Sequence, residues 1–478
     1  MGYNSHSMSE KQKPDLLEGN LTRAIIRLGY PMALASVVQT FYNLADTFWL
    51  GRLGREAISA PVISFNILFF IVSLAIGFSV AGTSLVSQFT GAGRTEQANR
   101  VAGNLLLFLF CFSLLFAVLG TVLAKPLLLM LATPADAMQS TLIYFRIMVM
   151  GMPLAFPFFV YQSVMNGYGD TKSPLKVELI SAGINLLMDP ILIFGLLGLP
   201  ALGVSGAALT TVVSRGVASM IGVSQLLRGR KGVRVKLRHM KPDFKLIPLL
   251  VKIGVPASIG MAGASLGFMV LIGIVNRFGT AVLSAYGIAT RVIHIFMMPA
   301  IGVSSAVTAI VGQNLGAGLT GRAKQAVSKG IRLVLWIIGP SMVLVAFLGS
   351  HFAVIFVPGD PLVQKVGSTM FFLIAPGVVF FALAAIINGA FQGAGYTLPV
   401  MAVNLSRIWL FRIPTVYVLS FVVLKGPVDL DAATGIWAGM LVSNLCAFLL
   451  IFFLYQRRDW SRARVHAAAR SRRGWDDR

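Results

Sequence analysis

The chain has 478 residues, of which 56% are hydrophobic and 12% are charged. An average soluble domain carries roughly 25% charged residues, so this composition excludes water-soluble folds, and its hydrophobicity equally excludes intrinsic disorder. The 48 glycines follow no three-residue period and there are two cysteines, which excludes collagen-like and disulfide-stapled classes.

Residues 1–22 are polar and lack the short apolar core of a cleavable signal peptide, so we expect an N-terminal tail there and insertion through the first membrane helix. Residues 1–7 precede Met8 and are either native or a vector remnant. Twelve apolar runs then follow, each long enough to cross a membrane as an α-helix. The predicted spans lie near 24–50, 57–90, 101–124, 139–165, 176–198, 203–227, 247–275, 281–313, 326–350, 364–391, 398–424 and 433–456.

This arrangement divides the 40 Lys and Arg residues unevenly. Segments on one side of the membrane hold 28 of them, segments on the other side hold six, and six lie in or near helices. Cytoplasmic segments are the ones enriched in Lys and Arg, so we expect both ends to be cytoplasmic in a multi-pass protein of the cell's inner (plasma) membrane. The same placement accounts for the net charge of +23 without nucleic acid.

The chain carries an internal repeat. "LGYP" ending at Pro31 recurs as "IGVP" ending at Pro256, and "SQFTGAG" at 87–93 recurs as "GQNLGAG" at 312–318, with the same shift along the chain in both cases. Six spans per repeat is an even number, so both lobes enter the membrane in the same direction, related by a pseudo-two-fold axis along the membrane normal. The predicted parts are the tail 1–22, a first lobe 23–227, a basic cytoplasmic linker 228–246, a second lobe 247–456 and a basic cytoplasmic tail 457–478.

Asp46 and Asp189 are the two acids that we place deep inside predicted spans, the first and the fifth. Asn185 lies one helical turn before Asp189 on the same face. Pro190 leaves the carbonyl of Leu186 without its helical donor, which loosens the backbone there. Polar residues of neighbouring spans that can face this point are Tyr144, Asn166, Thr210 and Thr211.

Three interpretations of the acids stay open. They can pair with Arg146 or Arg215 and simply hold the lobe together, although intramembrane ionisable groups are functional by default. If the two carboxyls converge, their mutual repulsion lets one of them bind and release a proton near neutral pH. Alternatively, the carboxylates with amide and hydroxyl oxygens make a site for a hard cation such as Na⁺.

The second lobe has no equivalent acids, since the shift of the repeat places Leu271 opposite Asp46. Arg291, Arg407 and Arg412 make it basic instead. Arg407 and Arg412 are five residues apart, so in an α-helix they point to different faces. We expect them to donate hydrogen bonds to carbonyls between packed helices, or else to favour substrates with an anionic group.

Four segments carry a resemblance to a known family. They are "YPMALASVVQTFYNLADTFWLGRLG" at 30–54, "SQFTGAGR" at 87–94, "NGYGDTKSP" at 166–174 and "INLLMDPILIFG" at 184–195. With the twelve spans in two repeats, the chain resembles multidrug and toxic compound extrusion (MATE) transporters over about residues 20–456. The resemblance implies a V-shaped fold whose lobes alternately open outward and inward. It also implies export of organic cations, drugs and toxins in exchange for protons or sodium ions.

Within that family, the chain is similar to the DNA-damage-inducible-F-like (DinF-like) branch, where an essential acid pair lies in spans one and five of the first lobe. Asp46 and Asp189 match those positions, with Asn185 beside the second. The resemblance further implies that Pro31 bends the first helix. The norfloxacin-exporter-like branch has its cation-binding acids in the second lobe, and this chain lacks those acids. Further residues that the resemblance adds to the first-lobe network are Tyr144, Asn166 and Thr211.

We therefore predict a secondary active multidrug exporter with its coupling site in the first lobe and a proton favoured over sodium. It needs no cofactor and no resident metal, apart from Na⁺ as the alternative ion at Asp46, Asp189 and Asn185. Its partners would be small, often cationic drugs and the lipid bilayer, and a two-lobed chain suffices as a monomer. The alternative is a lipid-linked precursor flippase, which would use the second-lobe arginines. A receptor offers no reason for buried acids, and an enzyme has no candidate nucleophile or metal cluster.

Overall fold

The computed structural model describes residues 16–131, 133–229, 232–357, 360–424, 426 and 430–461. Over these ranges the chain forms helices and no strand, and twelve helical stretches are long and apolar enough to cross a membrane. The predicted all-α fold with twelve spans is confirmed. Most of the two predicted tails, including residues 1–7, and residues 230–231 of the predicted linker lie outside the described residues.

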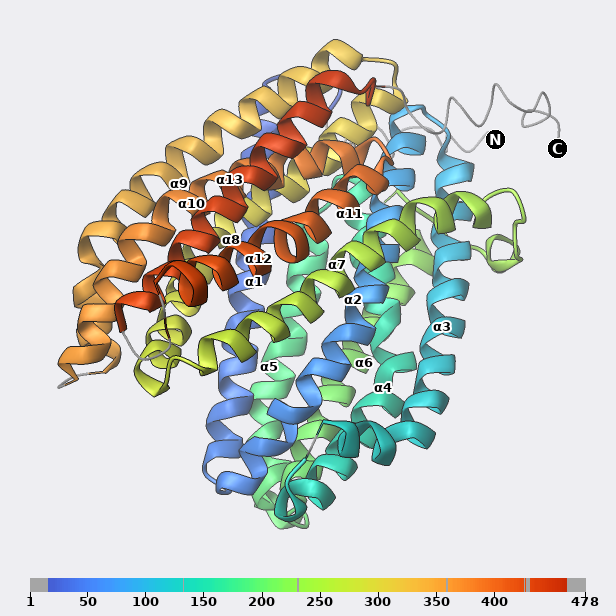
Figure 1. Cartoon of the computed structure of the whole chain (residues 1–478). Coiled ribbons are helices and arrows are strands. Elements are labelled where there is room, and N and C mark those ends of the chain that lie inside the picture. Colours follow the sequence, from blue (N-terminus) through green and yellow to red (C-terminus); the bar gives the residue numbers. More distant parts are fainter. Residues whose placement is uncertain are drawn as a thin grey trace, which may run out of the picture. The chain divides into compact units, whose positions relative to one another are not determined.

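The first six spans are single helices joined by short turns (Figure 1). They are α1 (Leu21–Gly51), α2 (Arg55–Gly91), α3 (Thr95–Met130), α4 (Ala135–Tyr168), α5 (Lys172–Phe194) and α6 (Val204–Arg228). Several exceed the apolar runs that predicted them, because their first or last turns are polar yet still helical. The turn after α2 places Gly93 at φ 72°, and its repeat partner Gly318 has φ 79°, a left-handed backbone that glycine adopts without steric cost.

The second six spans repeat this order with one irregular member. They are α7 (Ile247–Asn276), α8 (Thr280–Gly316), α9 (Thr320–Phe356), α10 (Pro361–Gly393), the eleventh span and α13 (Thr434–Arg457). The eleventh span starts as α11 (Thr397–Leu405) and continues through a π-helical segment, Ser406–Arg412. It then passes through α12 (Ile413–Tyr417) into a second π-helical segment, Val418–Val423. Such π-helical turns are rare and frequently occur at functional sites.

The described chain divides into two compact units whose helices pack in the same pattern. In unit 1, α2 packs against α3 and α4, α4 against α6, and α5 against α6. In unit 2, α8 packs against α9 and α10, α10 against α13, and α13 against the first π-helical segment. Each pairing has its counterpart in the other unit, as expected for a duplicated six-helix lobe.

The division between the units falls inside α1 and α7. Unit 1 contains Leu34–Ser258, whereas unit 2 contains Asn20–Ala33 and the chain from Ile259 onward. The two division points are separated by the same shift as the sequence repeat, so they fall at equivalent positions of the two repeats. The first half of each repeat's first helix therefore packs in the unit that the other repeat builds.

Close backbone approaches at glycine fix both of these exchanged half-helices. In unit 2, a Cβ on Gly29 of α1 would lie 3.2 Å from the backbone of Gly302 in α8. In unit 1, a Cβ on Gly77 of α2 would lie 2.3 Å from the backbone nitrogen of Ser258 in α7. Ser258 Oγ also donates a 2.7 Å hydrogen bond to the Leu74 carbonyl of α2. A side chain at Gly77 would clash with the α7 backbone, whereas one at Gly29 would need a small shift of α8.

Gly77→Ala should therefore destabilise the protein, because the new methyl group meets the backbone of α7, which cannot rotate away. Overpacking of this kind costs about 1–3 kcal/mol. Gly183→Ala in α5 is the matched control, since its Cβ would meet nothing within 4 Å. Alanine there should be neutral or stabilise by up to about 1 kcal/mol, because glycine is the poorer helix former. Thermal unfolding of the purified variants measures both, and equal midpoints for the two would contradict the close approach.

Candidate functional site

The structure brings together the two acids singled out from the sequence. Asp46 lies on α1 and Asp189 on α5, and their carboxyl groups lie side by side inside unit 1. Asp189 is fully buried and Asp46 is half-buried. Asn185 Nδ2 donates a 3.4 Å hydrogen bond to Asp189 Oδ1 from one turn earlier on α5, as the spacing predicts.

Local packing explains why the acids meet. Asp46 and Asp189 each lie five residues before the last residue of their helix, Gly51 and Phe194, so parallel helices bring them to one depth. One turn beyond the acids, Leu50 and Ile193 are buried in an apolar cluster with Ala57 and Ala207. This cluster joins the ends of α1 and α5 to the first turns of α2 and α6, one helical turn beyond the acids.

Several polar atoms of the acid pair and its polar neighbours have no hydrogen-bond partner. Asp46 Oδ1, Asp189 Oδ2 and Thr211 Oγ1 are buried and make no hydrogen bond within the described parts of the chain. Thr211 lies beside Asp46, and Tyr144 of α4 lies near both acids. Buried unpaired acceptors are costly, and a proton or an oxygen-coordinated cation would satisfy them. Among the described residues, no group of three or more His, Cys, Asp or Glu side chains gathers around a point.

Asn166 does not belong to the group of polar side chains around Asp46 and Asp189, contrary to the sequence-based expectation. It lies in the last turn of α4, about six turns after Tyr144. At a rise of about 1.5 Å per residue, the two positions are separated by about 30 Å along the helix. Neither predicted bend residue interrupts its helix: Pro31 lies inside α1, two residues before the division between the units, and Pro190 lies inside α5.

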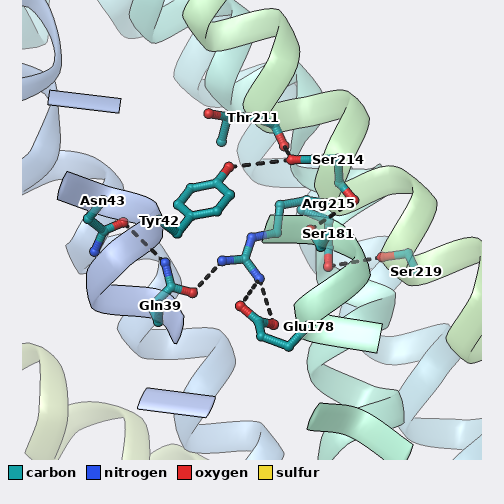
Figure 2. Close-up of polar contacts among 10 residues, drawn as sticks. Gln39, Tyr42, Asn43, Glu178, Ser181, Thr211, Ser214, Arg215 and Ser219 are labelled. Carbon is teal, nitrogen blue, oxygen red and sulfur yellow. Dashed lines mark hydrogen bonds and ion pairs between the residues drawn. The ribbon is translucent and has the colours of Figure 1, made fainter. Parts of the chain in front are cut away.

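The interpretation of the acids as ion-pair partners of Arg146 or Arg215 is wrong. Within the described residues, neither acid forms an ion pair. Arg146 is exposed. Arg215 of α6 pairs instead with Glu178 of α5, one guanidinium nitrogen donating to both carboxylate oxygens at 2.9 and 3.0 Å (Figure 2). Within the described residues, neither aspartate therefore has a cation directly paired with it.

Glu178 is the functional candidate that the sequence analysis missed. We predicted the fifth span to begin near residue 176, which places Glu178 at a helix end. In the structure α5 begins at Lys172, and Glu178 is buried with 4% of its surface exposed. A signal was present, because Glu178, Ser181, Asn185 and Asp189 follow one another at helical spacing and are all buried.

The ion pair and the acid pair belong to one continuous polar group. Arg215 lies one turn from Thr211 on α6, and Tyr42 lies one turn before Asp46 on α1. The Arg215 guanidinium lies 5.0 Å from the Tyr42 ring centroid, and its other terminal nitrogen donates to Gln39 of α1. Tyr42 Oη lies 3.4 Å from Ser214 Oγ (Figure 2). Arg215 thus joins α6 to both helices that carry the acids.

Unit 2 contains a different arrangement of charge. Arg407 and Arg412 are 7% and 2% exposed, whereas Arg291 of α8 is exposed. We expected Arg407 and Arg412 on different faces of an α-helix. They instead lie at the ring of one phenylalanine, Phe268, because a π-helical turn brings residues five apart onto one face.

Known proteins match the chain over nearly its whole length. The MatE family model matches residues 31–191 and again 256–418, and the two matches are offset by the shift of the sequence repeat. "Probable multidrug resistance protein YoeA" of Bacillus subtilis is 30% identical over 432 residues, 89% of this chain and 91% of that protein. The "FAD transporter" of Shewanella oneidensis is 26% identical over 452 residues, 94% of this chain and 97% of that protein.

A solved structure agrees with the fold. A multidrug resistance MATE family transporter in an outward-facing conformation superposes with a TM-score of 0.85 at 23% identity, over 96% of this chain and 99% of that one. The repeated family match, the full-length relatives and the common fold agree with one another. The chain belongs to the MatE family, whose members are multi-pass membrane transporters.

Proposed function

We propose that this chain is a secondary active exporter of lipophilic, often cationic drugs and toxins, driven by cation exchange at Asp46 and Asp189. The observation that carries the proposal is the meeting of these two carboxyls inside unit 1, each with one buried unpaired oxygen. A proton is the favoured coupling ion, because one proton shared between two carboxyls relieves their repulsion directly. Sodium held by both acids with Asn185 is the alternative.

The position of Asp46 on α1 suggests how coupling works. The acid-bearing half of α1 packs in unit 1, whereas residues 20–33 of the same helix pack in unit 2. A change of charge at Asp46 therefore acts on a helix that both units share, with Pro31 close to the division as the point that bends. Export needs only that drug and ion bias one equilibrium between two conformations in opposite directions.

The names of the relatives support small-molecule export and leave the substrate class broad. One is named for multidrug resistance and another for FAD, an anionic dinucleotide.

We propose an inner-membrane protein with cytoplasmic ends that acts as a monomer. Tyr144 and Thr211 would serve in the coupling network, and the DinF-like branch remains our prediction. A lipid-linked precursor flippase is the second candidate, and the buried Arg407 and Arg412 are the observation that favours it.

Ethidium uptake into inverted membrane vesicles tests the proposal. An imposed proton gradient and an imposed sodium gradient are applied separately to vesicles with and without the protein. We expect protein-dependent uptake under the proton gradient that collapses when a protonophore is added. Uptake under the sodium gradient alone would name sodium instead. Absence of uptake under either gradient, with folded protein present in the vesicles, would contradict the exporter and favour the flippase.

A further inference from the structure

Within the described residues, Arg407 and Arg412 are two buried arginines of unit 2 that form no ion pair with an acid. The chain contains no Asp or Glu between Asp243 and Asp360, or between Asp360 and Asp429. Asp360 accepts hydrogen bonds from the backbone at the start of α10, far from the middle of the span Thr397–Val423 that holds the arginines. Unit 1 differs, because there the half-buried Arg215 pairs with the carboxylate of Glu178.

The surroundings of the two guanidiniums differ. Arg412 Nε donates to Ser443 Oγ at 2.9 Å, and its terminal nitrogen donates to Asn444 Oδ1 at 2.7 Å. Arg407 makes no comparable contact: its Nε is buried and has no hydrogen-bond acceptor in the described parts of the chain. Arg412 is thus oriented by neutral groups that leave its charge uncompensated, while the donors of Arg407 remain available to a ligand.

Two aromatic rings lie close to the Arg407 guanidinium. Its guanidinium lies 4.7 Å from the ring centroid of Phe381 on α10 and 5.9 Å from that of Phe268 on α7. The Arg412 guanidinium lies 5.7 Å from the same Phe268 ring. Ring faces attract cations but accept no conventional hydrogen bond, so they stabilise the charge only in part. They also provide flat apolar surfaces against which an aromatic ligand can stack.

Two like charges at mid-membrane depth, one without any acceptor, are costly unless an anion joins them. We propose that Arg407, with Arg412 behind it, binds the carboxylate or phosphate of an aromatic amphiphilic substrate inside unit 2. Arginine suits this role because its planar fork of donors matches both oxyanions. The inference rests on the proposed export function and adds to its substrates molecules that carry an anionic group, zwitterions included. The depth favours a substrate over bulk lipid, whose phosphates stay at the membrane surface.

Two dyes that differ only in this group test the site: rhodamine B, which has a free carboxylate, and its ethyl ester, which has none. Binding is measured by fluorescence polarisation on the full chain in nanodiscs of phosphatidylcholine. Wild type should bind rhodamine B more tightly than the ester. Arg407→Gln should raise the Kd for rhodamine B about tenfold, the order expected for a lost charge-assisted hydrogen bond, and leave the Kd for the ester unchanged. Arg407→Lys should fall between.

The matched control is Arg291→Gln, which removes an exposed arginine of the same half of the chain and should change neither Kd. Equal binding of the two dyes to wild type, or equal effects of Arg407→Gln on both, would overturn the proposal. If Arg407→Gln does not fold, the dye comparison on wild type and Arg407→Lys decides in its place. If neither dye binds, the unfolding temperature of wild type is measured with benzoate and with benzamide. Benzoate should raise it more than benzamide does, and an equal effect of the two counts against the site.

Nanodiscs that contain phosphatidylglycerol separate the two sources of anion. If that lipid alone stabilises the protein through Arg407 and rhodamine B cannot compete with it, a lipid phosphate is the ligand and the substrate proposal is wrong. Dye binding requires no gradient, so it is measured equally well on an Asp46→Asn, Asp189→Asn double variant. Retained carboxylate selectivity together with no gradient-driven uptake by the wild-type protein would refute only the export proposal. Driven uptake with no role for Arg407 in dye binding would refute only this one.

Discussion

Asp46→Asn and Asp189→Asn should each reduce proton-driven ethidium uptake at least ~10-fold, to the level of vesicles without the protein. Asparagine keeps the shape of the side chain and its hydrogen-bonding capacity but cannot exchange a proton. The buried oxygens that lack partners belong to these two residues, so both variants remove the group that would take up the ion. Neutralising either residue also removes the repulsion between the carboxyls, which is the proposed source of the conformational response.

The matched control is Asp136→Asn, the same change at an exposed residue in the first turn of α4. It should retain wild-type uptake. Thermal unfolding of all three variants shows whether each is folded, and the two site variants should be no less stable than wild type because they remove a buried charge. Uptake at the wild-type rate from both site variants would rule out a coupling role for the pair, whichever ion drives transport.

The acid pair could be predicted from the sequence because few alternatives existed. A carboxylate deep in an apolar run is costly, so Asp46 and Asp189 stand out without any structure. Helical spacing then placed Asn185 beside Asp189. The number of spans followed from apolar runs, and the duplication followed from several segments that recur at one constant shift. These features depend on neighbouring residues or on a constant spacing, and both can be recognised in the sequence alone.

The remaining features depend on tertiary packing. Glu178 was misplaced because a helix can extend through polar residues, so the apolar run gave the wrong start for α5. The common face of Arg407 and Arg412 depends on a π-helical turn, which no spacing rule for α-helices predicts. Asn166 was expected in the network from its polarity and from the motif, and only the length of α4 shows how far it lies from Tyr144. The exchange of half-helices at Ala33 and Ser258 has no sequence signal, because an apolar helix is equally suited to either unit.

Glu178→Gln should lower the free energy of unfolding by about 2–4 kcal/mol, because it leaves the Arg215 guanidinium charged without its counter-ion. The lower end is expected, since the Arg215 side chain is 18% exposed and water can screen part of the charge. Glu96→Gln is the matched control: it makes the same change in an exposed pair with Arg238. Exposed pairs contribute about 0–1 kcal/mol, so that variant should be near wild type in thermal unfolding.

A second substitution separates charge from shape. Glu178→Gln combined with Arg215→Gln removes both charges and should recover most of the stability that Glu178→Gln alone loses.

The single variant Glu178→Gln and this double variant should also differ in transport. With Glu178 neutral, Arg215 can turn toward Asp46, which already lies within its electrostatic reach, and would hold that carboxylate ionised so that uptake fails. Removing Arg215 as well frees Asp46 again, and uptake should return. If the double variant transports no better than Glu178→Gln alone, the ion pair contributes packing to unit 1 and does not keep Arg215 away from the coupling acid.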